Sequence, residues 1–171
     1  MSPDGRLLLY TQANPQTKND VWVLSNVGGS PSDRRATPLL NREFNETEAR
    51  FSPELSTSPW VAYTSDESGR NEVSVCEVSQ NAMGTKWRVS QAGGVNPRWR
   101  ADGKELFFAA PDGTIMSVDI TPGATFQAST PKPLFRVPSG NLPNWDVTPD
   151  GKRFLVLVQQ DPQAPFTVWQ N

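Results

Sequence analysis

Short stretches of alternating apolar and polar residues recur along the chain, and turns rich in proline, aspartate and glycine separate them. Alternation with a period of two is typical of β-strands that bury one face. No stretch of ten or more residues keeps the 3.6-residue period of a helix, and prolines interrupt most candidates. The pattern therefore predicts an all-β protein.

One turn phrase returns four times at near-equal spacing. Its copies begin at positions 2, 52, 100 and 148, which are 50, 48 and 48 residues apart, and they read "SPDG", "SPEL", "RADG" and "TPDG". Proline, aspartate and glycine at these positions are typical of a tight β-turn. The second copy has Glu54-Leu55 in place of Asp-Gly and three extra residues before Trp60, so we expect a wider loop there.

Each unit between successive turns contains apolar stretches of strand length. The expected strands are residues 7–10, 21–25 and 36–40, then 48–52, 60–63, 73–78 and 85–90, then 96–100, 105–108, 114–120 and 132–137, and finally 144–148, 153–156 and 166–170. Four antiparallel strands in a repeat of 40–50 residues are typical of a propeller blade. A β-sandwich is the competing all-β fold, but it does not require a repeated turn at fixed intervals.

We therefore predict a β-propeller built of four-stranded antiparallel blades, with about four blades present. The chain is expected to form a single partial, open propeller domain over residues 1–171. Its blades would span about 1–44, 45–92, 93–140 and, incompletely, 141–171.

The two ends leave different blades incomplete. The first unit lacks its innermost strand and the last lacks its outermost, so the four units are not expected to close a ring. The chain would be the C-terminal part of a longer propeller, or a subunit that completes its ring with another chain. Self-association through the uncovered outer faces is expected. Those faces would carry Leu7, Leu9, Val21, Val23, Phe154, Val156, Val158 and Val168, or their alternates on the opposite side.

The repeated phrases "FSPELSTSPWVAYTSDESGRNEV", "NPRWRADGKELFFAAPDGTIMSVDI" and "DVTPDGKRFLV" resemble a known family. They are similar to the WD40-like β-propeller repeat of TolB-like proteins, and above all to C-terminal propellers of bacterial receptor-type serine/threonine kinases and related sensors. The resemblance implies a non-catalytic module that binds a protein or a small ligand through the propeller face or channel. It also implies a periplasmic or extracytoplasmic location.

Composition narrows the chemistry. The formal net charge of −2 offers no basic field for nucleic acid, and no apolar run approaches the length of a membrane span. The chain has no histidine and one cysteine, which excludes Ser-His-Asp catalysis, His-ligated metals and thiolate metal cages within it. Kinase motifs are also absent. We therefore predict no enzymatic activity and no cofactor. The alternative is a carboxylate-based hydrolase or lyase fragment on a propeller scaffold, which needs two facing carboxylates.

Three residues are the candidates for binding. Arg50, Arg98 and Asp146 each stand one position before the apolar anchor of an expected innermost strand, where they would face the central channel. Pairing with each other or with a neighbouring blade is the structural alternative. The segment "SDESGRNE" at 65–72 is rich in the oxygen donors that calcium prefers, but it lacks the spacing of an EF-hand and is predicted to be a solvated connection.

Overall fold

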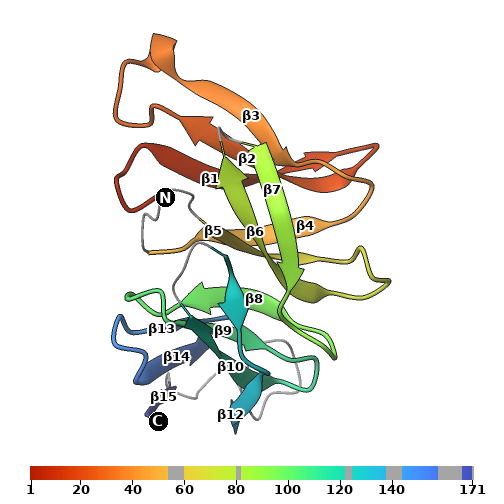
Figure 1. Ribbon diagram of the computed structural model, residues 1–171, viewed down its shortest axis with the longest axis vertical. Helices are drawn as coiled ribbons and strands as arrows, with labels where there is room; N and C mark the ends of the chain where they lie inside the picture. The colour runs from red at the N-terminus through yellow and green to blue at the C-terminus, as the bar shows by residue number, and fades with distance from the viewer. Residues whose placement is uncertain (54–59, 80–81, 122–124, 138–143, 158–166, 171) are drawn as a thin grey trace, which may run out of the picture.

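The computed structural model describes residues 1–53, 60–79, 82–121, 125–137 and 144–157, and the backbone of 167–170. Four separate antiparallel sheets follow one another along the chain (Figure 1). The first sheet contains β1 (Leu7–Asn14), β2 (Lys18–Ser25) and β3 (Arg35–Leu40); the second contains β4 (Glu46–Phe51), β5 (Trp60–Ser65), β6 (Glu72–Ser79) and β7 (Ala82–Arg88). The third contains β8 (Val95–Trp99), β9 (Glu105–Ala109), β10 (Thr114–Thr121), β11 (Gln127–Ala128) and β12 (Lys132–Arg136); the fourth contains β13 (Asn144–Val147), β14 (Arg153–Leu157) and β15 (Thr167–Gln170).

These strands confirm the all-β class predicted from the sequence. Every expected strand overlaps an observed one, and neighbouring strands pair antiparallel throughout. Within the described residues the helical structure is a single 3-10 turn at Pro31–Asp33. No described helix is long and apolar enough to cross a membrane. The assignment of the sheets to propeller blades, and the blade boundaries, stay predictions.

The third sheet has one strand more than expected. The two-residue strand β11 pairs with the end of β10 at Ile120 and Thr121, whereas β12 pairs with its beginning. Strand β10 has eight residues, so both β11 and β12 can pair with it along the same edge. Polar residues lie between β11 and β12, so the alternation of apolar and polar positions did not reveal the two-residue strand β11.

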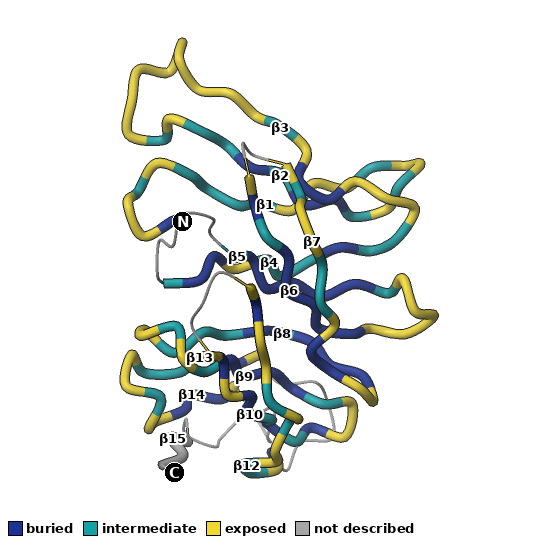
Figure 2. The backbone as a smooth tube through the Cα atoms, viewed as in Figure 1, coloured by how far each residue is buried: buried dark blue, intermediate teal, exposed yellow. Residues whose placement is uncertain are grey.

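The sheets stack in chain order along the long axis of the molecule (Figure 2). An apolar cluster lies between each sheet and the next. Strand β6 shows how one strand serves two clusters. Cys76 and Val78 face the first sheet, while Val73 and Val75 face the third. Alternate side chains of a strand point to opposite faces, so a central sheet must be apolar on both. Cys76 is fully buried, and burial raises the pKa of its thiol to about 12.

On the first and fourth sheets the most apolar side chains point toward the neighbouring sheet. The outer faces of the stack therefore carry the side chains that alternate with them along each strand. Val21 and Val23 face the second sheet, and Phe154 and Val156 face the third, so all four are buried. The prediction that these four side chains line the uncovered faces is therefore wrong. The alternative given with it applies, in which the side chains on the opposite side of each strand face outward. On the fourth sheet the alternates are Leu155 and Leu157, which are 52% and 54% exposed. Val158 lies outside the described residues, as does the side chain of Val168.

The repeated turn closes in the same way in three of its copies. The glycine at the fourth position of the turn has a positive φ and donates its backbone N–H to the carbonyl of the residue at the first position. The aspartate before this glycine accepts a hydrogen bond from the backbone N–H of the residue after it. The closing bonds run from Gly5 to Ser2, from Gly103 to Arg100 and from Gly151 to Thr148. In the second copy Ser52 pairs with Trp60, eight residues on, where Ser2 pairs with Leu7, five residues on. The difference is the three extra residues, and the wider loop that the sequence predicts falls on residues 54–59, which lie outside the described residues.

Candidate functional site

The first strands of three successive sheets lie next to one another. Strand β8 contacts β4 on one side and β13 on the other. The indole N–H of Trp99 on β8 donates to the carbonyl of Arg50 on β4, at 3.2 Å, and holds these two strands together. The 48-residue repeat therefore places Arg50, Arg98 and Asp146 at corresponding positions on adjacent strands.

A bulge precedes the arginine on both β4 and β8. The strand register shifts between Thr47 and Arg50 and again between Val95 and Arg98. Glu48 and Asn96 occupy these bulges with φ values of 58° and 57°, a region that non-glycine residues seldom adopt. A bulge bends its strand and redirects the side chains that follow. We infer that it aims the side chains of Arg50 and Arg98.

Glu48 ties the two bulges together. Its carboxylate accepts a hydrogen bond from the backbone N–H of Asn96 at 2.7 Å, and another from the Thr64 hydroxyl at 2.7 Å. The sequence reasoning missed this residue. A signal was present, because Glu48, Asn96 and Asn144 share the 48-residue spacing and each stands two positions before a candidate.

Arg98 is the most enclosed of the three candidates. Its side chain is only 12% exposed, and its guanidinium lies 3.6 Å from the Asp146 carboxylate. The guanidinium also lies over the Trp145 ring, 5.7 Å from the ring centre, where the two attract by cation–π interaction. Burial and the positive charge of Arg50 lower the pKa of Arg98, and Asp146 and Glu48 oppose that shift. Arg98 remains protonated, because the ordinary arginine value is very high.

Asp146 and Arg98 border a cavity of about 250 Å³. The Asp146 side chain is 75% exposed, whereas its partner is nearly buried. Asn144 lines the same cavity, and the exposed Leu155 and Leu157 form an apolar wall. The cavity thus combines a carboxylate that water can reach, a fixed guanidinium and a side-chain amide.

Arg50 lies near this cavity without lining it. It is exposed, and its charge is close enough to influence Arg98. The structure therefore brings Arg98 and Asp146 into one site and leaves Arg50 at its edge. The Arg98–Asp146 ion pair also matches the structural alternative given for these residues, since two neighbouring sheets are joined by it.

The oxygen-rich segment at 65–72 forms the hairpin between β5 and β6. Asp66 accepts from the backbone and side-chain amides of Asn45, both at 2.8 Å, and Glu67 is paired with Lys86. Glu72 is buried and paired with Arg70 at 2.6 Å. Among the described residues no group of three or more histidine, cysteine or acidic side chains is arranged to hold a metal ion. The hairpin carboxylates are used within the protein.

Comparison with known proteins finds similarity among solved structures. No protein-family model and no curated protein matches the chain. Among solved structures, the chain is similar to a provisionally assigned 6-phosphogluconolactonase of Bacteroides uniformis ATCC 8492, with a TM-score of 0.65 and 17% sequence identity. The match covers 99% of this chain and 48% of that one, so the chain spans about half the length of the solved structure. The two share a fold.

This similarity contradicts two predictions made from the sequence. The chain was expected to be a non-catalytic TolB-like binding module and not an enzyme, whereas the protein that shares its fold is described as a hydrolase of a sugar lactone. The prediction relied on the resemblance to TolB-like propellers and on the absence of histidine. The absence of histidine does not exclude catalysis, because a carboxylate can serve as a general base and fixed cations can stabilise an oxyanion. Both groups are present at Arg98 and Asp146.

Proposed function

We propose that the four sheets are consecutive blades of a β-propeller and that β4, β8 and β13 line its central channel. Three observations support this arrangement. The sheets repeat every 48 to 50 residues, each packs face to face on the next, and their first strands adjoin one another. These are the features expected of propeller blades.

On this scaffold the chain contributes to a hydrolase whose substrate is a small cyclic ester of a sugar acid. The observation that carries the proposal is the Arg98–Asp146 pair at the cavity of about 250 Å³. The solved structure of similar fold supports the choice of substrate class, because it is described as a 6-phosphogluconolactonase. The cavity is near the lower end of the size range of small-molecule sites, which suits a single sugar unit.

Asp146 is the proposed general base. Its carboxylate is open to solvent and can accept a proton from the water molecule that attacks the ester carbonyl. Attack forms a bond between the water oxygen and the carbonyl carbon, and the carbonyl oxygen becomes an oxyanion. Collapse of this intermediate breaks the ring C–O bond, and the proton held by Asp146 passes to the departing ring oxygen. The product is the open-chain acid.

Arg98 is the proposed oxyanion and substrate anchor. Its guanidinium is held in place by Asp146 and Trp145, so it is oriented before substrate arrives. A fixed cation in a partly buried site stabilises developing negative charge more than a mobile one in water. Asn144 can add an amide donor from the same cavity wall. Arg50 extends the positive charge at the edge, where an anionic group on the substrate would be attracted.

Lactone hydrolysis measured by acid release tests this proposal. δ-Gluconolactone and 6-phosphogluconolactone should be hydrolysed faster than in buffer alone. Asp146→Asn should lower kcat by about 10²–10⁴-fold, the usual contribution of a general base. Asp33→Asn, a change at an exposed aspartate in the 3-10 turn between β2 and β3, is the matched control and should leave the rate unchanged. A folded wild-type chain with no rate above buffer, or an Asp146→Asn variant as active as wild type, would overturn it.

A further inference from the structure

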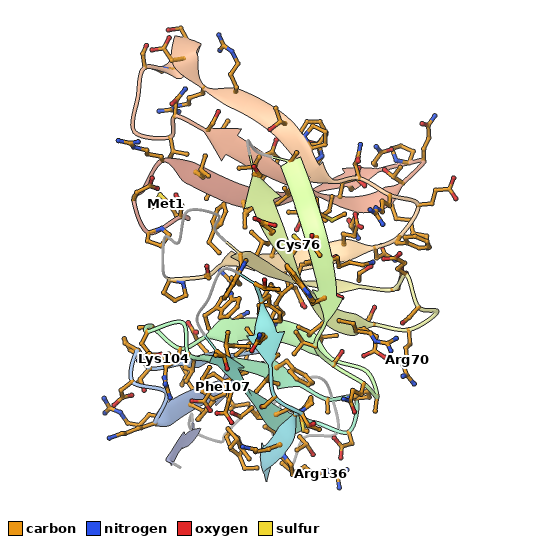
Figure 3. All side chains as sticks on the ribbon, in the orientation of Figure 1. Met1, Arg70, Cys76, Lys104, Phe107 and Arg136 are labelled. Carbon is orange, nitrogen blue, oxygen red and sulfur yellow. The ribbon has the colours of Figure 1, made fainter. Side chains whose placement is uncertain are left out.

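A second polar pocket, of about 480 Å³, lies on the second sheet. Three serines, two glutamates, Lys86 and Arg88 line it, and none of them lines the cavity beside Arg98. The hairpin between β5 and β6 borders the pocket, and Arg70 marks that hairpin in Figure 3. The pocket is therefore a feature separate from the proposed hydrolytic site.

The register of β6 and β7 places its cationic side chains together. Ser74 is paired with Arg88 across the two strands, and Cys76 is paired with Lys86. Residues two apart on a strand share a face, so Lys86 and Arg88 project on the same side as Ser74. This is the face of the second sheet that turns toward the first, as the packing of Cys76 shows.

Both carboxylates of the pocket already have partners. Glu67 pairs with Lys86 and lies 3.7 Å from the guanidinium of Arg42. Glu72 pairs with Arg70 at 2.6 Å and accepts hydrogen bonds from the Ser90 hydroxyl and, at 3.0 Å, from the backbone N–H of Gly93. Neither glutamate is left to neutralise Arg88.

Arg88 and Ser74 are two donors of the pocket that have no partner among the described residues. Arg88 is exposed, and within the described part of the chain its guanidinium forms no ion pair or hydrogen bond. Ser74 is only 6% exposed, and its hydroxyl likewise has no partner among the described residues. The residue lines the pocket, so a water molecule or a ligand there can reach its hydroxyl.

We propose that this pocket binds a small molecule carrying an oxyanion, either a carboxylate or a phosphate. Arg88 presents the two-pronged donor geometry that such groups accept, and Ser74 adds a hydroxyl donor across the strand pair. Arg88 forms no ion pair among the described residues, so its guanidinium is available to pair with an oxyanion on a ligand. The Ser65 hydroxyl accepts from the backbone N–H of Glu67 and can still donate to a hydroxyl group on the ligand.

Amide and arginine NMR shifts, followed during titration of the whole chain, test the proposal. Inorganic phosphate and gluconate are the two probes, and sodium chloride at equal ionic strength is the reference. At least one probe should give saturable shifts at residues around Ser74 and Arg88. A response to phosphate alone or to gluconate alone would identify which oxyanion the pocket prefers.

Substitutions separate this pocket from general charge effects. Arg88→Gln should weaken binding of the responding probe at least tenfold, and Ser74→Ala should weaken it by a smaller factor. Arg34→Gln, at an exposed arginine outside the pocket, should bind as wild type does. Asp146→Asn should also retain binding of the probe. A finding that the chain does not hydrolyse lactones would therefore leave the binding result unchanged. Absence of saturable shifts with both probes, or equal affinity in a folded Arg88→Gln variant, would overturn the proposal.

Discussion

The carboxylate of Glu48 accepts a hydrogen bond from the backbone N–H of Asn96, 2.7 Å away on the neighbouring sheet. Both residues have positive φ values and both sit in a strand bulge, 48 positions apart. A side chain in one copy of the repeat thus accepts the hydrogen bond of a backbone N–H group in the next copy. The contact stabilises the strands that carry Arg50 and Arg98.

We expect Glu48→Ala to destabilise the protein by about 1–3 kcal/mol, because it leaves the Asn96 N–H and the buried Thr64 hydroxyl without their acceptor. Urea unfolding followed by tryptophan fluorescence would measure the change. Glu43→Ala, at an exposed glutamate, is the control and should have little effect. Equal losses in the two variants would show that the Glu48 contacts contribute nothing specific.

Glu46→Gln should stabilise the protein at neutral pH. Glu46 is 1% exposed, and burial raises the pKa of its carboxyl above the ordinary value of 4.5, with Asp20 and Glu67 adding to the shift. The folded state therefore holds the proton more tightly than the unfolded state, and wild-type stability falls as the pH rises above 4.5. We expect a gain of about 0.5–2 kcal/mol at pH 7, shrinking toward pH 4. Unfolding curves across that range would test it, and a loss of stability at pH 7 would contradict it.

Glu72→Gln should have the opposite effect. Burial alone would raise the pKa of Glu72, but hydrogen bonds from Ser90, Arg70 and Gly93 outweigh it and hold the pKa below 4.5. The ionised form therefore stabilises the fold above pH 4.5, and this contribution is lost as the pH falls through the lowered value. We expect a loss of about 1–3 kcal/mol at pH 7 that diminishes in acid. The same unfolding series applies, and a loss independent of pH would exclude this explanation.

Self-association remains a prediction, and the structure identifies the side chains that would drive it. Leu155 and Leu157 project from the fourth sheet with half of their surface exposed. A second copy of the chain that covered this face would remove apolar surface from water. Sedimentation velocity at micromolar concentration should show species larger than 18.9 kDa, and Leu155→Lys with Leu157→Lys should shift the distribution toward the monomer. A wild-type chain that sediments only as a monomer would show the prediction wrong.

Strand positions and turns could be predicted from the sequence because their causes are local. Alternation of apolar and polar side chains identifies a strand, and aspartate and glycine in a tight turn form their bonds within a few residues, as at Asp102 and Gly103. The 48-residue repeat also placed Arg50, Arg98 and Asp146 at corresponding positions before any contact was known.

Only the tertiary structure decided what these residues touch. Whether Arg98 meets Asp146, and whether Glu48 reaches Asn96, depends on the twist and spacing of adjacent sheets, which no local pattern encodes. The same holds for the face on which Val21 or Leu155 stands, because alternation gives two faces without saying which is covered. Composition misled the prediction of function for the same reason. Catalytic capacity depends on how carboxylates and guanidinium groups are brought together in space, and residue counts do not contain that information.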